Sequence, residues 1–381
     1  MAHRLLLLLT IIGVWVSPAC AEQLVPPPLE RPMQHVYRWI YFGPSGTGYA
    51  ADREVLIRTT DGGRTWAEVI NIERDQRSFI YRLSFFDETT FLVYGWGGFY
   101  RTSDRGLTFT RLTATGPNLE DPTRTIGTGH AAFVDPQHGW EAAGRQYLRT
   151  TDGGQTWRAG YLFLPKGKEV SGVVMFDLQH GLALGSRFLV RTTDGGITWR
   201  APIEQLPARN LEIRCVPAGF CIAVERPATT AYFTTDYGET WRATETGIAA
   251  EKEPIADLQA IGVNDAVIVG QRELREWEVE RSQGPGLPPV VTRPSGPIVP
   301  DHAYLQRWDG TQWRRTEYPE IETFWAIHYV SATDVWASAD TNGILHSTDG
   351  AQTWTFVPDY YRQIAALTPT MPPLVLPTPT P

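Results

Sequence analysis

A short motif recurs along this chain and constrains its fold more than any other feature. In its fullest form it reads Ser/Thr-x-Asp-x-Gly-x-Thr-Trp, as in TTDGGQTW at 150–157. The copies are marked by seven aspartates: Asp61, Asp104, Asp152, Asp194, Asp236, Asp309 and Asp349. Successive aspartates are 43, 48, 42, 42, 73 and 40 residues apart. Because the 73-residue gap holds an insertion, the chain consists of seven copies of one unit with a period near 42 residues.

Each unit contains four short runs typical of β-strands. In the fourth unit, two apolar runs joined by a turn (VVMFDLQHGLALG, 173–185) precede a third run, FLVRT, that leads into the motif. A fourth run follows the Thr-Trp pair. Four runs separated by turn residues predict a four-stranded antiparallel blade. Seven such blades predict an all-β fold, a seven-bladed β-propeller that covers residues 34–357.

The recurring aspartate has a mechanical explanation. Its carboxylate can accept hydrogen bonds from turn amides, and the glycine two residues later can adopt the positive φ that a tight turn needs. We therefore interpret the seven aspartates as structural, and not as metal or catalytic sites. Six of the 14 tryptophans stand at the last motif position, so the abundance of tryptophan reflects the repeat. They are Trp66, Trp157, Trp199, Trp241, Trp313 and Trp354.

The motif resembles the Asp-box, also called the bacterial neuraminidase repeat. Seven boxes preceded by FxDxxxGWAxG-like hairpins make the chain similar to the photosystem II stability and assembly factor family over roughly residues 34–357. Phe109 replaces the tryptophan in the second copy, and two further departures matter, because the sixth copy is one residue shorter with Arg307 at its start and the seventh has Ala351 in place of glycine. We expect reshaped turns there. The resemblance implies a non-catalytic scaffold that binds a protein through an arginine-rich surface.

The N-terminus has the pattern of an export signal. His3 and Arg4 precede an apolar run, and Ala19-Cys20-Ala21 resembles a cleavage site, so residues 1–21 are predicted to be a signal peptide cleaved after about Ala21. The apolar run is too short for a transmembrane helix. Lipidation of Cys20 stays open as an alternative. Export would place the protein in a periplasm, outside the cell or in a compartment like the thylakoid lumen.

Export also bears on the two remaining cysteines. Cys215 and Cys221 flank a turn between two β-like runs, so their sulfurs should face each other across a hairpin. In an oxidising compartment this arrangement predicts a disulfide. Two buried free thiols remain the alternative.

The first strand of each blade should line a central channel. Aligning these strands on the turn that follows brings one residue from each blade to the same level: Arg38, Arg82, His130, Gly172, Glu212, Gln259 and Ala326. The two arginines and the histidine predict a cationic mouth that grips an acidic peptide segment. The alternative is a set of solvated channel residues that have partners among their neighbours.

The long connections are expected on the face opposite the Asp-boxes, where loops on a rigid scaffold usually bind partners. The longest is the insertion at 273–302 in blade six, and its Trp277 is a candidate partner contact. It is either a docking element or a tolerated surface insertion. Residues 358–381 form a Pro/Thr-rich tail.

Composition and motifs restrict the remaining functions. With 34 basic and 42 acidic residues the net charge is −8, which argues against a broad nucleic-acid surface. Nucleotide-binding, metalloprotease and hydrolase motifs are absent from the sequence, so we expect no cofactor and no metal. The favoured function is an exported, monomeric scaffold for a protein partner such as a membrane-protein assembly intermediate. A sialidase-like glycoside hydrolase or a carbohydrate-binding module stays open, although no pair of loop carboxylates has a spacing that indicates catalysis.

Overall fold

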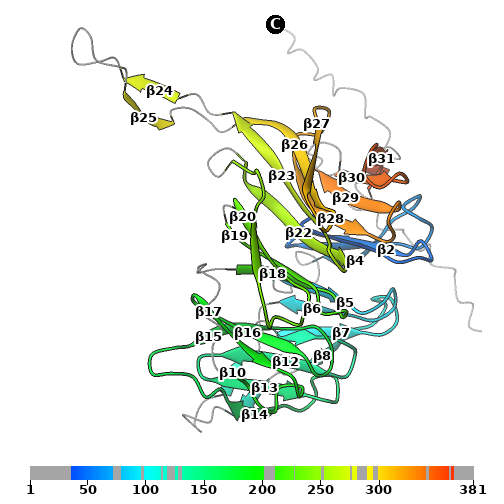
Figure 1. Ribbon diagram of the computed structural model, residues 1–381. Coiled ribbons are helices and arrows are strands. Elements are labelled where there is room, and N and C mark those ends of the chain that lie inside the picture. The colour runs from blue at the N-terminus through cyan, green and yellow to red at the C-terminus, as the bar shows by residue number, and fades with distance from the viewer. Residues whose placement is uncertain are drawn as a thin grey trace, which may run out of the picture.

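A computed structural model describes residues 36–71, 79–95, 98–112, 115–117, 125–127, 131–200, 211–226, 228–249, 253–274, 277–280, 290–294, 299–339, 343–359 and 362–363. Within these residues the chain forms seven antiparallel sheets that follow one another around a ring (Figure 1). The last sheet lies beside the first, which closes the ring. The prediction of a seven-bladed β-propeller is confirmed.

The strands have these bounds, blade by blade. Blade one has β1 (Trp39–Phe42), β2 (Gly48–Ala51), β3 (Val55–Thr59) and β4 (Ala67–Asn71); blade two has β5 (Ile80–Phe85), β6 (Phe91–Gly95), β7 (Gly98–Thr102) and β8 (Thr110–Leu112). Blade three has β11 (Ala132–Phe133), β12 (Gly139–Ala143), β13 (Gln146–Thr150) and β14 (Arg158–Tyr161); blade four has β15 (Val170–Met175), β16 (Gly181–Gly185) and β17 (Phe188–Thr192). Blade five has β18 (Leu211–Cys215), β19 (Cys221–Glu225), β20 (Thr230–Thr234) and β21 (Arg242–Glu245). Blade six has β22 (Ile255–Gly262), β23 (Asp265–Leu274), β26 (Val299–Trp308) and β27 (Trp313–Tyr318); blade seven has β28 (Phe324–Tyr329), β29 (Val335–Ala339), β30 (Gly343–Ser347) and β31 (Thr355–Val357).

Two short ribbons lie outside the blades. β9 (Thr115–Pro117) pairs with β10 (Thr125–Gly127) in the link from blade two to blade three. β24 (Trp277–Glu280) pairs with β25 (Val290–Pro294) in the predicted insertion. In blade four, the Arg200 amide donates to the Arg191 carbonyl at 2.7 Å, which places the start of the fourth strand; residues 201–210 lie outside the described part.

The hydrophobic core is divided into seven clusters, one at each blade interface. Trp140 of blade three is the largest fully buried side chain, and its indole N–H donates to the Gly195 carbonyl of blade four at 2.8 Å. Since each sheet buries both of its faces against neighbours, the apolar surface of the ring is shared between blades and no blade has a complete core of its own.

The Asp-box turns are held by side chains within the motif. In blade one, Asp61 Oδ1 accepts hydrogen bonds from the Thr59 hydroxyl at 2.8 Å and the Thr65 amide at 2.9 Å, and Thr65 Oγ1 donates to Asp61 Oδ2 at 2.6 Å. Thr59 Oγ1 in turn accepts the Gly63 amide at 2.9 Å. The Trp66 indole N–H donates to the Gly63 carbonyl at 3.1 Å. The carboxylate and hydroxyl thus organise the turn that joins strands three and four.

The backbone of these turns corrects one expectation. Both residues after the aspartate have positive φ, 71° at Gly62 and 82° at Gly63. Only the second of them was expected to have a positive φ. Arg105 and Tyr237 adopt φ near 60° at the first position without being glycine. The turn network is therefore strong enough to hold a left-handed residue that has a side chain.

The two departing boxes behave differently. In blade six, Asp309 Oδ1 accepts from the Thr311 and Gln312 amides, and Arg314 Nε donates to Oδ2 at 2.8 Å, so this turn is reshaped as expected. In blade seven, Ala351 adopts φ 72° and its amide still donates to the Ser347 hydroxyl at 2.9 Å. The seventh turn keeps the common network.

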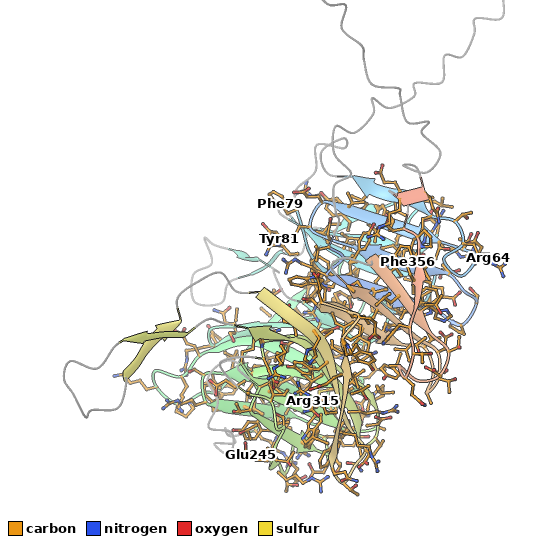
Figure 2. The ribbon with its side chains drawn as sticks, turned by 90° about the horizontal axis from the view of Figure 1, so that it is seen from above. Arg64, Phe79, Tyr81, Glu245, Arg315 and Phe356 are labelled. Carbon is orange, nitrogen blue, oxygen red and sulfur yellow. A yellow bond between two sulfur atoms is a disulfide. The ribbon has the colours of Figure 1, made fainter. Side chains whose placement is uncertain are left out.

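The ring has two different faces. In every blade except the sixth, the Asp-box turn is hydrogen-bonded to the turn between strands one and two, as in Gly195 N to Gln179 O at 2.8 Å, so these turns share the box face. The opposite face, here called the loop face, carries the blade-to-blade links and the arm β24–β25. In Figure 2, Phe79, Tyr81 and the arm lie on the left, and Arg64 of the first Asp-box lies on the right.

Contacts of blade one with blade seven and with Gln363 close the ring. Every blade is continuous in sequence, so blades one and seven share no strand. The Phe42 and Trp336 rings stack with centroids 3.5 Å apart. Gln363 accepts the Trp66 amide at 3.3 Å and donates to the Arg64 carbonyl at 2.9 Å. The segment predicted to be a tail therefore begins with contacts to blade one; residues 364–381 lie outside the described part.

Candidate functional site

A central channel runs through the ring and encloses a cavity of about 1500 Å³. Residues from the first strand of all seven blades contribute to its wall. Since these strands present one edge to the channel, their side chains are the surface that a ligand inside the ring would meet.

Most residues that the sequence aligned at one level do line the channel. Arg38, Arg82, Glu212, Gln259 and Ala326 are on its wall. Gly172 lies between the wall residues Ser171 and Val173.

Two predicted partner contacts are not placed by this geometry. His130 lies outside the described residues. The backbone of Trp277 begins β24 on the arm, and its side chain is outside the described part.

Three arginines lie on the channel wall on blades one and two. We call Arg38, Arg53 and Arg82 the open arginines, because no carboxylate in the described part of the chain lies within ion-pair distance of them. The Arg38 guanidinium lies 5.1 Å from the centre of the Trp325 ring, and that of Arg82 lies 5.9 Å from the centre of the Tyr94 ring.

The environment of Arg82 favours an anion. Its side chain is open to the channel but lies deep within the ring, and this burial lowers its pKa, with the nearby Arg214 acting in the same direction. The open arginines lie toward the loop face. Arg53 is in the turn between β2 and β3, and Arg38 is just before β1. A carboxylate entering there would meet cations that have no competing acid.

Blades five and six carry a contrasting cluster, here called the paired cluster. Glu212 binds Arg214 at 2.9 Å through Oε1 and Arg226 at 3.0 Å through Oε2. Asp257 Oδ1 lies 3.9 Å from Arg214 Nη2. The positive charges on this side of the channel are therefore matched by carboxylates of the protein itself.

Asp257 and Gln259 also support blade seven. Asp257 Oδ2 accepts the Ile327 amide at 3.1 Å, and Gln259 Oε1 accepts the Tyr329 amide at 3.1 Å. These amides are on the free edge of β28, where no strand is available to accept them. Burial raises the pKa of Asp257, and Arg214 partly opposes this effect. Gln259 is thus a structural residue of the channel wall.

An aromatic wall continues from the open arginines toward the box face. The Tyr41 ring stacks on Phe85 with centroids 4.3 Å apart and lies 4.9 Å from the His328 ring. Burial lowers the pKa of His328 to about 4, and His328 Nε2 lies 3.0 Å from the Phe42 carbonyl oxygen. Burial raises the pKa of Tyr41 to about 12. Both rings are uncharged near neutral pH and serve as an apolar surface.

This aromatic wall was not predicted from the sequence. Its signal is the aromatic content of RWIYF (38–42), in which Arg38 directly precedes β1 and Tyr41 lies on that inner strand. An alignment of one residue from each inner strand gives a single level of the channel and does not show what lies further along the strands.

The cysteines close a hairpin beside the channel. Cys215 and Cys221 are directly opposite in the β18–β19 register and form a disulfide. Cys215 is on the channel wall next to Arg214, and Cys221 is fully buried. The bond fixes the turn at the start of blade five.

The described residues offer binding chemistry. No group of three or more His, Cys, Asp or Glu side chains among them could hold a metal ion. Among the same residues, no helix has the length and apolar character needed to cross a bilayer. The site combines open arginines, aromatic rings and acids that are already engaged.

Residues 119–260 match the family model described as photosynthesis system II assembly factor YCF48. The predicted resemblance to this family is confirmed. No curated protein matches the sequence. Among solved structures, YCF48 from Cyanidioschyzon merolae aligns with a TM-score of 0.53 and 16% identity, over 86% of this chain and 98% of that one.

Two further structures are similar. The extracellular domain of the putative one component system BT4673 from B. thetaiotaomicron has a TM-score of 0.55 and 11% identity, over 84% of this chain and 41% of that one. A structure described as YCF48 bound to D1 peptide has a TM-score of 0.49 and 17% identity, over 74% of this chain and 81% of that one. At such identities, the alignments to YCF48 from C. merolae and to BT4673 show a shared propeller fold.

Proposed function

We propose that this chain is an exported, non-catalytic propeller scaffold that binds an acidic segment of a protein partner in its central channel. The partner class is a membrane-protein assembly intermediate, as in the photosystem II assembly factor family whose model matches residues 119–260. The observation that carries the binding function is the presence on the channel wall of Arg38, Arg53 and Arg82, for which the described residues offer no acidic partner.

The cavity suits an extended peptide. Its volume of about 1500 Å³ exceeds that of ordinary small-molecule sites, which reach about 1,000 Å³. Carboxylates of the segment would pair with the open arginines near the loop face, and apolar side chains would lie on Tyr41 and Phe85. Charge-assisted hydrogen bonds of this kind contribute about 1.5–3 kcal/mol each.

The same geometry argues against glycoside hydrolysis in the channel. Such enzymes need two convergent carboxylic groups free to act as acid and base or nucleophile. Glu212 is held by two arginines, and Asp257 by an arginine and two backbone amides. Glu212 and Asp257 therefore serve the protein's own structure, and the open arginines are the groups left for recognition.

The test is recovery of membrane proteins by the mature protein from its own membranes. The Arg38→Ala/Arg82→Ala variant is expected to lose the partner, by about tenfold in affinity for each arginine. Arg214→Ala/Arg226→Ala is the matched control, with two channel arginines removed from the paired cluster, and it should retain the partner. Equal loss in both variants, or turnover of a glycoside panel by the wild-type protein, would contradict the proposal.

Export is tested separately. N-terminal sequencing of the protein recovered from its host should begin at Glu22. A lipid-modified Cys20 at the N-terminus would support membrane anchoring and contradict cleavage after Ala21.

A further inference from the structure

Phe163 is the most exposed large apolar side chain in the described part of the chain, at 88%. It lies on the link between β14 and β15, on the loop face between blades three and four. Its neighbours Leu162 and Leu164 are only 1% and 6% exposed and belong to the core between these blades. The loop is therefore anchored on both sides of Phe163 while this one ring points outward.

The backbone holds Phe163 in this position. The Leu164 amide donates to the Leu162 carbonyl at 2.8 Å, which forms a three-residue γ-turn centred on Phe163. The Leu162 amide donates to the Arg145 carbonyl at 2.8 Å. Two buried leucines flanking such a turn direct the central side chain away from the core.

Arg145 fastens the rest of the loop. Its guanidinium donates to the Leu164, Pro165 and Lys168 carbonyls at 2.5, 3.0 and 3.3 Å. The Lys168 amide donates to the Pro165 carbonyl at 3.1 Å across a turn in which Gly167 has φ 79°. The protruding loop thus has several backbone groups satisfied internally, which lowers the cost of moving it out of water.

The surroundings of Phe163 are cationic. Lys166 is exposed, and Lys168 lies with its ammonium group 4.8 Å from the centre of the Phe188 ring. With Arg145 these make three cations, and Glu169 is the one exposed acid in the loop. This basic tip contrasts with the net charge of −8 of the whole chain.

We propose that the loop 162–169 docks on an anionic lipid bilayer surface, with Phe163 in the interface and Lys166 and Lys168 at the level of the lipid phosphates. An aromatic ring bordered by lysines on a convex, internally bonded loop suits the boundary between headgroups and acyl chains. Lysine is depleted in protein–protein interfaces, so this rim favours lipid over a protein pocket. Contact through the loop face turns the open end of the channel toward the membrane.

The experiment measures co-sedimentation with protein-free vesicles. The wild-type chain should bind vesicles of phosphatidylcholine mixed with phosphatidylglycerol more tightly than vesicles of phosphatidylcholine alone, and added salt should weaken this binding. Phe163→Ala should weaken it about tenfold, because burying a Phe side chain contributes about 1.5–3 kcal/mol. Lys166→Glu should weaken it at least about fivefold.

Ile197→Ala is the matched control, since Ile197 is 65% exposed on the box face. It should leave vesicle binding unchanged. Both exposed positions should tolerate alanine, and thermal unfolding of each variant checks that the fold is retained.

Three results would overturn the proposal: equal binding to both kinds of vesicle, equal loss in Ile197→Ala and Phe163→Ala, or no binding to anionic vesicles. If Phe163→Ala binds vesicles normally but recovers less protein from membranes, the occupant of this site is a protein pocket and the lipid proposal fails. Because the vesicles contain no protein, failure here leaves the proposed channel function standing.

Discussion

The two sides of the central channel use the same residue for different purposes. On blades five and six, Arg214 and Arg226 share Glu212, with Asp257 close by. On blades one and two, Arg38 lies against the Trp325 ring and Arg82 against the Tyr94 ring, and no carboxylate of the described residues is within ion-pair distance of the open arginines. Both sets line one cavity.

The difference shows that an arginine on a channel strand is not by itself a binding residue. In the paired cluster the protein's own acids compensate the arginine charge, which stabilises the wall. The charges of the open arginines are not neutralised by carboxylates of the described residues. An acidic ligand that pairs with them therefore gains electrostatic binding energy. The predictions below test whether the paired cluster contributes to the free energy of unfolding while the open arginines do not.

The largest expected effect comes from removing the shared acid. Glu212→Ala leaves Arg214 and Arg226 without their common partner, and we expect the free energy of unfolding to fall by about 2 kcal/mol. Arg82→Ala should cause no such loss, because no carboxylate among the described residues is paired with Arg82. Urea denaturation of the two variants measures both values. Similar losses would show that the two sides of the channel are energetically alike.

The Asp-box turns provide a third environment, in which a carboxylate is stabilised by hydrogen bonds alone. Asp194 accepts from the Thr192 and Thr198 hydroxyls and from the Thr198 amide. Asp194→Ala should lower the free energy of unfolding by about 1.5 kcal/mol. The same denaturation series tests this, and a change below the error of the wild-type value would show that the turn is held by its backbone.

Acid pH should distinguish these turns from the arginine pairs. Hydrogen bonds within the turn lower the pKa of Asp61 and Asp152 to about 2. Because the folded pKa is below the unfolded value of about 3.9, this contribution is present above about pH 4 and is lost as the pH falls toward about 2.

The test compares acid unfolding of the wild-type chain with that of Asp61→Asn/Asp152→Asn. The variant should lose less stability between pH 4 and pH 2, because two of the titrating groups are gone. An unchanged dependence on pH would mean that other carboxyl groups determine acid unfolding.

The smallest expected effect is that of Arg226→Ala. The Arg226 side chain is 52% exposed, and Glu212 keeps Arg214 after its removal. The free energy of unfolding should change by less than about 1 kcal/mol. A loss as large as that of Glu212→Ala would place the main stabilising contact of the paired cluster at Arg226.

The repeat made the blades predictable because its chemistry is local. Thr59, Asp61 and Thr65 lie within seven residues, and the corresponding residues form the same network in every blade except the sixth. Placing Arg38 and Arg82 on the channel wall was also possible, since strands of equal length that begin at equivalent turns reach the same level. Whether each arginine binds a ligand or stabilises the wall depends on which carboxylates lie near it in the folded ring. The sequence of a single strand does not show this.

The contacts of the paired cluster could not be predicted from the sequence. Glu212 lies on β18, Arg226 directly follows β19, and Asp257 comes from the next blade. Their contacts depend on how the blades are rotated around the channel. Phe163 is a similar case: LFLP looks like a strand end, and only the burial of Leu162 and Leu164 shows that the ring between them points into solvent.

The sequence by itself determined the number of blades, the turns that join their strands and the face on which each connection lies, because a motif repeated at a fixed period repeats its hydrogen bonds. The tertiary structure decided which channel arginines are compensated and which side chains the closed ring leaves exposed. These properties arise between blades, where residues far apart in the chain meet, and no local pattern encodes those distances.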